Sequence, residues 1–573
     1  MIDVEAPPPT RTPLPLILIR GFGGVKVEDE KRIAYQGFND GTVYPHKRGD
    51  NYIYEGLILR LLKSNWKYQD ATNVIGYYSS PVLDRAPEID PELQQRFPEI
   101  SPDFFGGTSS EEYETQDEGK FKVVIDQAMA LHLLQSAEDV YKTIWVFRYY
   151  DLDDRAFAAY GAALVRLIDF IRVLATKKDE SAPKVNIIAH SMGGLLVREA
   201  IQSTYPSDQR RASDYVNRVV TLGTPHQGIS FQLLKNWILL GAEEELERFS
   251  PDLQKSESKE FSFKNLKKHF PLERLLTIVG TDYRSYGSEA ASIANRFFSV
   301  PGEFGPNYNR SDGLVKQKYA QIPGAPRTFV HKCHGGVDSL VTSREGFEIA
   351  TRFFFGNVRA RLRMIDSQIT RGRDFFGRSE FFFGVSIKPR GVDFDLFHQS
   401  AAAENCYGPF NETDLSDEDV GFGWAGPDRL IWEGYLDTAP ILTNTRKEVK
   451  DMVLRVDLYV GERDLRGVGF SDNVIFRSQY YVRALLQPKL RLYLYSDERF
   501  EGENVAEIGE YGTQMEPTQN GWQFSVGRGQ SDGRVEDDPG YYGVFQIEID
   551  DVPVVGLPKQ RVPVKEESVA APE

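Results

Sequence analysis

Up to about residue 357, short apolar runs alternate with stretches of helical periodicity, and this alternation constrains the fold more than any other feature. Short apolar runs of this kind are typical of strands that are buried on both faces of a sheet. Strands that alternate with helices indicate a mainly parallel sheet with helices on both faces, so we predict an α/β fold. Strands are expected at residues 14–19, 73–78, 143–148, 185–189, 218–222 and 275–279, and helices at 52–62, 156–176, 193–202 and 344–355.

Two stretches interrupt the alternation. Residues 82–119 are rich in Pro, Asp, Glu and Ser and are expected to form a long exposed loop. Residues 229–270 begin with an apolar segment, 231–242, and continue as a charged helical stretch. A long insertion of this kind is either a functional cover or an ordinary excursion, and both interpretations of 229–270, a lid or a helix packed on the sheet, stay open.

Beyond residue 358 the pattern changes to strands without intervening helices. Stretches at 359–369, 380–387, 453–460, 489–495 and 542–549 are rich in β-branched and aromatic residues and are separated by turn residues. This pattern predicts a β-sandwich. A chain of 573 residues also exceeds what one hydrophobic core usually organises. The expected organisation is an α/β domain over 1–357, a β-sandwich-like domain over 358–558 and a disordered tail over 559–573.

Composition excludes several classes of protein. The net charge of −16 disfavours binding to nucleic acid, because phosphate backbones are repelled. Two cysteines, Cys333 and Cys406, provide neither a disulfide framework nor a four-cysteine zinc site. No run of eighteen apolar residues is present, and the N-terminus lacks a basic start followed by an apolar stretch. These features predict no transmembrane segment and no signal peptide, and therefore a cytoplasmic location, with secretion left open.

The segment AHSMGG at residues 189–194 follows an apolar strand and precedes a helical stretch. A serine at such a strand-to-helix turn has a strained backbone and presents its hydroxyl at the edge of the sheet. Small residues are needed two positions before and after it, because strand and helix pass close together, and Ala189 and Gly193 meet that need. A helix N-cap serine would need no such neighbours. The context therefore favours Ser191 as a nucleophile.

With this segment the chain resembles the α/β-hydrolase superfamily, and within it bacterial lipases and the lipase-like inositol deacylases. Further matching segments are RGFGG at 20–24, LGTPHQG at 222–228, SDGLV at 311–315 and a later histidine. The resemblance covers about residues 10–357. It implies a serine esterase or lipase whose triad follows the chain order serine, acid, histidine.

The glycine-rich turn after the first strand is the expected oxyanion hole. Preorganised backbone N–H groups must meet the carbonyl oxygen as it becomes an anion. The resemblance implies that the N–H groups of Phe22 and Met192 are these donors. The family usually has histidine where this chain has Arg20. A dinucleotide-binding turn is the alternative, but the full glycine spacing for it is missing.

Three histidines follow Ser191 and the candidate acids, namely His331, His334 and His398. A nucleophilic serine needs one of them as its base. His398 belongs to the β-rich region and is not expected to reach the site. His334 is in a glycine-relaxed loop between a strand and a helix, where the catalytic histidine of this fold belongs. We predict His334 as the base and keep His331 as the alternative.

Two aspartates compete to orient that histidine. Asp312, in the segment SDGLV, matches the acid-bearing motif of bacterial lipases and is close in sequence to His334. Asp282 follows a strand, which is another position that hydrolases use, but it also suits a turn cap. We predict Asp312. His226, in the LGTPHQG segment, is interpreted as structural, and His190 is expected to point away from the base position.

The sequence thus predicts cleavage of carboxylic esters, most readily of acyl or lipid esters, with transient contact to a membrane surface possible. No cofactor or metal is predicted, because Gly336 occupies a position where an acidic calcium ligand is expected and the acidic run 414–419 suits a solvated loop. Three alternatives stay open: acyl transfer to another acceptor, amide cleavage by the same triad, and a binding protein that keeps the fold without turnover.

Overall fold

The structure is a computed structural model of the whole chain. It describes residues 13–21, 55–64, 66–71, 74–76, 88–100, 124–125, 127–137, 140–147, 157–176, 181–228, 247–256, 259–284, 310–336, 338–370, 379–390, 394–401, 403–410, 429–438, 451–464, 473–486, 489–496, 512–527 and 540–552, and every structural statement below refers to these residues.

The first half of the chain forms a seven-stranded sheet with the order β2-β5-β1-β6-β7-β8-β9. Every pair of neighbouring strands in it is parallel, as the alternation predicts. Its strands are β1 (Leu16–Ile19), β2 (Gln69–Asp70), β5 (Thr143–Phe147), β6 (Val185–His190), β7 (Val216–Leu222), β8 (Leu275–Gly280) and β9 (Arg327–Val330).

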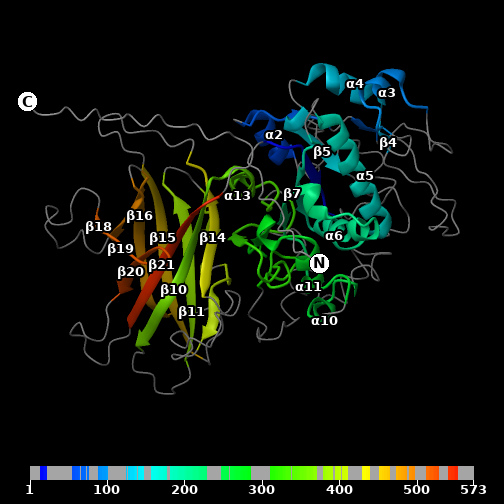
Figure 1. Cartoon of the computed structure of the whole chain (residues 1–573). Coiled ribbons are helices and arrows are strands. Elements are labelled where there is room, and N and C mark those ends of the chain that lie inside the picture. Colours follow the sequence, from blue (N-terminus) through cyan, green and yellow to red (C-terminus); the bar gives the residue numbers. More distant parts are fainter. Residues whose placement is uncertain are drawn as a thin grey trace, which may run out of the picture.

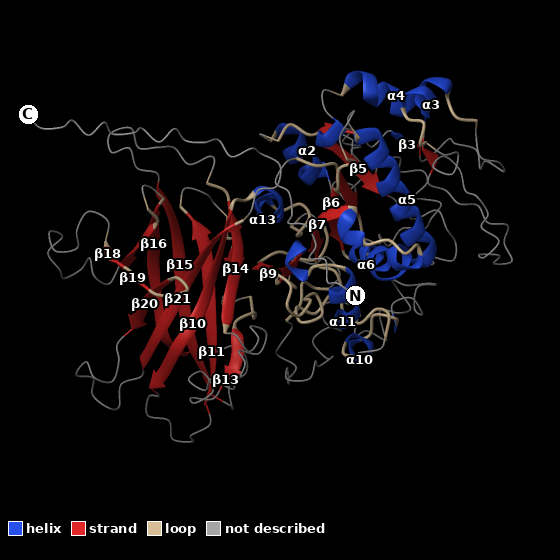
Figure 2. Ribbon diagram, in the orientation of Figure 1, coloured by secondary structure: helices blue, strands red, loops and turns tan. Residues whose placement is uncertain are grey.

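Both faces of this sheet are covered, which is why most of its strands are rich in apolar residues. Successive side chains of a strand point to opposite faces, and Ile17 and Ile19 accordingly belong to one buried cluster while Leu16 and Leu18 belong to another. Helices α5 (Phe157–Ala175) and α6 (Gly193–Glu199) pack in the first cluster, and α2 (Glu55–Lys63) and α13 (Arg344–Phe355) in the second. The result is a three-layer α/β arrangement (Figure 2).

The second half of the chain is β-rich and antiparallel (Figure 1). One sheet has the order β14-β10-β21-β20-β19, and the other has the order β12-β11-β15-β16-β17-β18, with β13 also paired to β11. The strands are β10 (Val358–Thr370), β11 (Ser379–Pro389), β12 (Phe397–His398), β13 (Tyr407–Phe410), β14 (Leu430–Leu436), β15 (Asp451–Asp464), β16 (Asn473–Leu485), β17 (Arg491–Ser496), β18 (Thr513–Gln514), β19 (Glu516–Pro517), β20 (Trp522–Gly527) and β21 (Gly540–Asp551).

The change from a parallel to an antiparallel pattern falls between α13, which ends at Phe355, and β10, which begins at Val358. We propose the domain boundary at this junction. The two halves nevertheless share one cluster of buried side chains, which runs from a face of the parallel sheet into the β-rich region. The edge strand β9 lies against β12 and β14, so the β-rich region covers one edge of the parallel sheet.

Two expectations differ from the structure. The described part of residues 73–78 does not join the main sheet: β3 (Ile75–Gly76) pairs instead with β4 (Val124–Ile125) in a separate antiparallel ribbon, and the short polar strand β2 takes the edge position. Residues 82–119 contain helix α3 (Pro91–Arg96), capped by Asp90 and with Leu93 fully buried, rather than only an exposed loop. Apolar segment 231–242 and tail 559–573 lie outside the described residues.

The remaining helices are short or flank the sheet. They are α4 (Gln127–Ser136), η4 (Val140–Lys142), η5 (Ala200–Thr204), α7 (Tyr205–Ser207), η6 (Ala212–Asp214), α10 (Pro251–Gln254), α11 (Phe263–His269) and η7 (Leu272–Arg274). None of the helices in the described ranges is both long enough and apolar enough to cross a bilayer.

Candidate active site

Ser191 is located at the turn between strand β6 and helix α6, as the sequence predicts. Its φ is 53°, a left-handed conformation that is uncommon for a residue with a side chain. The backbone N–H of Ser191 donates a hydrogen bond to the Leu222 carbonyl of the neighbouring strand at 2.9 Å. A Cβ at Gly193 would be 2.7 Å from the Arg20 carbonyl oxygen, so only glycine lets the helix approach the end of β1 this closely.

The structure brings Ser191, His334 and Asp312 together, although Ser191 lies far from the other two in the sequence. The Ser191 Oγ lies 2.8 Å from Nε2 of His334. The other ring nitrogen of His334, Nδ1, lies 2.8 Å from Oδ2 of Asp312. With a proton on Nδ1, His334 donates to Asp312 and its Nε2 accepts from the serine hydroxyl. These are the contacts that a nucleophile, base and orienting acid require.

The carboxylate of Asp312 is held by its own loop. Its Oδ1 accepts hydrogen bonds from the N–H groups of Leu314 at 3.1 Å and Val315 at 2.7 Å. The carbonyl of Asp312 also accepts from the N–H of His334 at 2.8 Å. Backbone and side chain therefore both tie the acid loop to the histidine loop, which fixes the direction of the carboxylate toward Nδ1.

The backbone of Gly223 packs closely against the side chains of Asp312 and His334. It has a φ of +57°, and a Cβ there would be 2.9 Å from Oδ2 of Asp312 and 3.1 Å from Nδ1 of His334. Any side chain would intrude on the hydrogen bond between the two groups. This explains the glycine in the LGTPHQG segment in physical terms.

The three side chains are almost completely buried. Ser191 is 8% exposed, His334 is 4% exposed and Asp312 is 1% exposed. In a site with so little water the effective dielectric constant is low, so that charge–charge and hydrogen-bond interactions are stronger than at a surface.

Of the two expected oxyanion donors, only Met192 belongs to the described residues, and Phe22 lies outside them. Met192 is the N-cap of α6, and among the described residues no carbonyl accepts a hydrogen bond from its N–H. The turn after β1 also lies against the nucleophile, because a Cβ at Gly21 would be 2.5 Å from the Ser191 Cβ. Arg20, where the family usually has histidine, is buried and its Nε donates to the Gly21 carbonyl at 3.3 Å.

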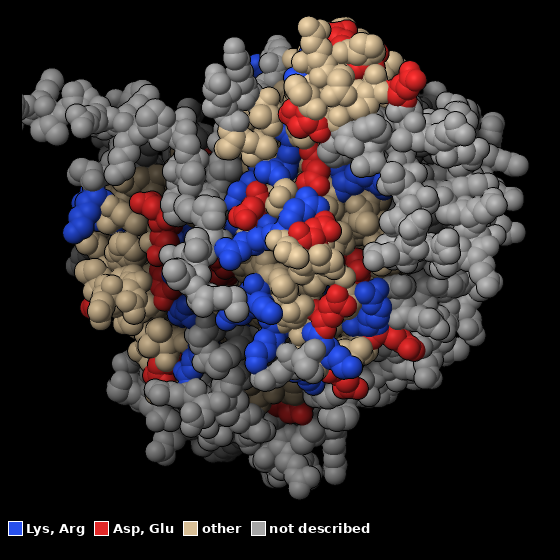
Figure 3. Space-filling view, turned by 45° about the vertical axis from the view of Figure 1, so that its right-hand side comes forward, with Lys and Arg blue, Asp and Glu red and all other residues tan. Residues whose placement is uncertain are grey.

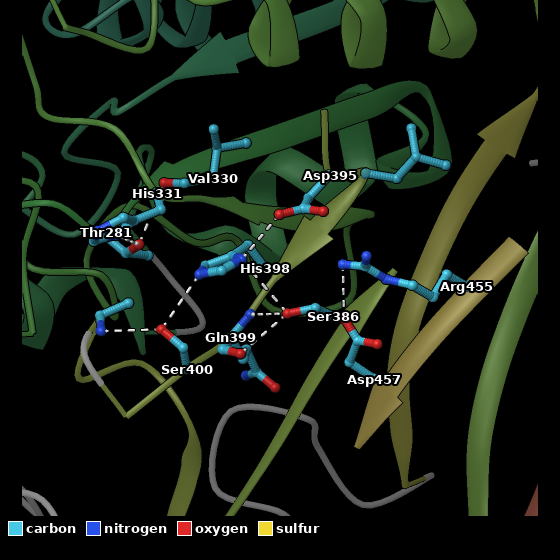
Figure 4. A network of polar contacts seen from close by, with 12 residues as sticks. Thr281, Val330, His331, Ser386, Asp395, His398, Gln399, Ser400, Arg455 and Asp457 are labelled. Atoms are coloured by element: carbon cyan, nitrogen blue, oxygen red, sulfur yellow. Dashed lines mark hydrogen bonds and ion pairs between the residues drawn. The ribbon is translucent and has the colours of Figure 1, made fainter. Parts of the chain in front are cut away.

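His331 and His398 lie together in a different polar network (Figure 4). Their rings lie side by side at a tilt, with centroids 5.5 Å apart. Nδ1 of His331 is 3.2 Å from the Thr281 hydroxyl, and Nδ1 of His398 is 3.0 Å from Oδ2 of Asp395. The two imidazoles thus join the parallel sheet to the β-rich region, and His334 is the one of the three candidates that contacts Ser191.

Asp282, the alternative acid, caps the turn that follows β8. Its Oδ1 accepts a hydrogen bond from the Arg284 N–H at 3.0 Å. This is the local role that its sequence context also allows. The contact with Nδ1 of His334 is made by Asp312 instead.

His190 has a role that the sequence does not suggest. Its Nε2 lies 2.8 Å from the carbonyl oxygen of His334, so this nitrogen carries a proton and donates it. Burial, followed by the neighbouring His334, lowers the pKa of His190 well below its ordinary value, so the ring is neutral. A neutral imidazole beside the nucleophile therefore holds the backbone of the histidine loop. No sequence signal distinguishes this role from simple packing.

Two further side chains near the site, those of His226 and Cys333, are not suited to act as a base or a nucleophile. His226 is fully buried, and its Nε2 lies 3.0 Å from the Thr221 hydroxyl. Burial lowers its pKa well below the ordinary value, which fits a structural role. Burial and the nearby Asp312 raise the pKa of Cys333 to about 12, so this cysteine beside His334 stays a thiol and is a poor nucleophile. Within the described ranges no group of three or more His, Cys, Asp or Glu side chains is arranged to bind a metal ion.

A family model described as "PGAP1-like alpha/beta domain" matches residues 110–278. The matched range contains the turn with Ser191 and ends before Asp312 and His334. No curated protein matches the chain at a significant level.

Several solved structures are similar to the chain at low identity. A lipase from Bacillus licheniformis, BlEst2, is 21% identical over 39% of this chain and 86% of its own, with a TM-score of 0.28. The metagenomic carboxyl esterase MGS0156 is 17% identical over 34% of this chain and 55% of its own, with a TM-score of 0.24. Phospholipase PlaB from Legionella pneumophila is 12% identical over 65% of this chain and 91% of its own, with a TM-score of 0.23. Similarity at this level does not extend to substrate or mechanism.

The parallel sheet and its strand-to-helix turn give the first half of the chain an α/β-hydrolase-like fold, part of which matches the PGAP1-like alpha/beta domain, and a β-rich region follows.

Proposed function

We propose that the protein is a serine hydrolase that cleaves carboxylic esters through an acyl-enzyme on Ser191. The observation that supports this most is the unbroken hydrogen-bonded chain from the Ser191 hydroxyl through His334 to Asp312, with both contacts at 2.8 Å. A binding protein without turnover would have no need of such an arrangement.

In the proposed reaction, Oγ of Ser191 attacks the ester carbonyl carbon while Nε2 of His334 accepts the hydroxyl proton. Asp312 orients the ring and stabilises the imidazolium that forms. The carbonyl oxygen becomes an anion, for which the N–H groups of Met192 and Phe22 are the proposed donors. His334 then gives its proton to the departing alkoxide oxygen. Water, deprotonated in turn by His334, releases the acid from the serine.

The substrate class that we propose is an acyl or lipid ester. This proposal rests on the likeness of the segments AHSMGG, LGTPHQG and SDGLV to those of lipases. Acyl transfer to an alcohol and amide cleavage use the same chemistry up to the acyl-enzyme. Product analysis with added alcohol or with an anilide substrate separates these activities from hydrolysis of an ester.

The test is a series of nitrophenyl esters of increasing acyl length, assayed with the natural chain and with Ser191→Ala. We expect hydrolysis by the natural chain and loss of nearly all of it in the variant, by about 10³-fold or more. Comparable hydrolysis by Ser191→Ala would refute the proposal.

A matched pair of variants tests the base. His334→Ala should lose activity to the same degree as Ser191→Ala, because triad members act as a unit. His331→Ala should keep most of it, since this ring contacts Thr281 and His398 instead. The opposite result would move the role of base to His331.

A further inference from the structure

A cavity of about 490 Å³ opens on the flank of the α/β domain, between helices α2 and α13. This volume lies within the range of small-molecule sites, roughly 300–1,000 Å³. None of the proposed catalytic residues lines it. The side chains around it include those of Arg60, Lys63, Trp66, Arg344, Glu348 and Arg352.

The lining carries an excess of positive charge on a chain with a net charge of −16. Four of the lining residues are cationic, whereas two, Glu348 and Asp437, are acidic. On the face shown in Figure 3, acidic and basic side chains are interspersed. A local excess of cations around one cavity is therefore a specific feature and does not follow from the overall composition.

Arg60 contributes a cation that has no carboxylate as a direct partner within the described residues. Its Nη1 donates to the carbonyl oxygens of Thr342 at 3.0 Å and Ser343 at 3.4 Å, which positions the guanidinium at the cavity wall. Partial burial lowers the pKa of Arg60 and Arg344 acts in the same direction, whereas the carboxylates of Glu345 and Glu348 act in the opposite direction without reversing the shift. An anion in the cavity would favour the charged guanidinium further.

The two arginines of α13 share a single acid. Arg352 forms an ion pair with Glu348, and Nε of Arg344 lies 3.7 Å from the same carboxylate. Both guanidinium groups also lie over the ring of Phe394, at 5.4 Å and 5.0 Å, which holds them in place. Arg344 is in the first turn of the helix, where the helix dipole is already positive, so the dipole adds to the attraction for an anion.

We propose that this cavity binds a phosphate ester, with the arginines and Lys63 on the phosphate and Trp66 and Phe347 against its carbon skeleton. A guanidinium group can donate two parallel hydrogen bonds to two oxygens of one phosphate. Several cations around one cavity also favour a doubly charged phosphate over a singly charged carboxylate. The phosphate ester is either a soluble small molecule or the headgroup of a lipid, since both present the same chemistry to the cavity.

The test compares two double variants that remove the same charge. Lys63→Gln with Arg344→Gln changes the cavity, and Lys267→Gln with Lys268→Gln changes helix α11, whose residues do not line it. Binding of sn-glycerol 3-phosphate is measured by calorimetry. Binding to vesicles of phosphatidylcholine, with and without phosphatidic acid, is measured by sedimentation.

We expect saturable binding of at least one probe, weakened tenfold or more by the cavity variant and unchanged by the α11 variant. Binding of glycerol phosphate identifies a soluble ester, and binding to phosphatidic acid vesicles alone identifies a headgroup. Ester hydrolysis, measured on a soluble nitrophenyl ester, should be the same in both variants and serves as the test of folding. The proposal would be overturned if neither probe bound saturably, or if the two variants bound the probes equally well.

Discussion

The choice between Asp312 and Asp282 is the one that the sequence leaves most open, because both lie where a turn is expected. In the structure, Oδ2 of Asp312 contacts His334, whereas Oδ1 of Asp282 accepts from the Arg284 N–H. Asp312→Asn should reduce kcat by about 10⁴-fold, since an amide favours the wrong histidine tautomer. Asp282→Asn is the matched control and should retain activity in the same ester assay. Equal losses in the two variants would contradict the assignment of the acid.

Gly223 permits a second comparison at the scale of single residues. Gly223→Ala places a Cβ 2.9 Å from Oδ2 of Asp312, and it also forces alanine into a φ of +57°. Gly324→Ala imposes a similar backbone penalty at a φ of +82°, but its nearest neighbour is 3.6 Å away and lies outside the site. In both variants the free energy of unfolding, measured in urea, should be lower by about 1–2 kcal/mol.

Only Gly223→Ala should in addition reduce kcat by tenfold or more, measured well below the unfolding transition. If Gly324→Ala lost as much kcat as Gly223→Ala for a similar loss of stability, the loss of kcat would come from general backbone strain. It would then not come from intrusion on the hydrogen bond between Asp312 and His334.

At the scale of elements, the end of β6 is joined to the histidine loop through His190. His190→Leu removes the hydrogen bond to the His334 carbonyl, which costs about 1 kcal/mol. Displacement of the catalytic ring by as little as ~1 Å can cost about 10²-fold in kcat. His190→Gln, whose Nε2 can replace that of histidine, should restore much of kcat with little change in KM. Equal kcat for the two variants would show that the hydrogen bond to the loop does not matter.

The elements that the sequence predicts well are those in which local pattern and burial agree. The five strands β1 and β5 to β8 each contain a short apolar run, and each is expected within a few residues of its observed bounds. The edge strand β2 (Gln69–Asp70) is polar and two residues long, so it carries no periodic signal and is held by pairing with β5. Residues 73–78 have the apolar signal, but their described part, β3, pairs with β4 instead, because pairing depends on distant segments.

The same reasoning applies to the β-rich region. Strands β14, β16 and β20 are absent from the prediction, although β16 alternates between buried and partly buried positions through much of its second half. Its first half is largely exposed and contains Arg477 and Ser478, which weaken the pattern. In the site, Ser191, His334 and Asp312 are indicated by motifs, whereas the contact of His190 depends on a loop 144 residues away and has no local signal.

At the scale of the whole molecule, two buried neutral histidines couple stability to pH. Burial lowers the pKa values of His190 and His226 well below the ordinary 6.5. The unfolded chain therefore takes up protons near pH 6.5 that the folded chain rejects. Stability from these groups is complete above that pH and is lost as the pH falls.

The free energy of unfolding should thus decrease by up to about 1.4 kcal/mol per pH unit for each histidine below pH 6.5. Urea unfolding at a series of pH values measures this slope, and His226→Gln should make it shallower. A slope that His226→Gln leaves unchanged would mean that His226 is protonated in the folded state.

The most direct measurement of the central claim is covalent labelling of the folded protein with a fluorophosphonate probe, followed by peptide mapping. The account predicts one adduct per chain, on Ser191, with strongly reduced labelling in His334→Ala because the hydroxyl then lacks its base. The absence of an adduct on Ser191 in protein that is folded, or equal labelling of His334→Ala, would contradict it.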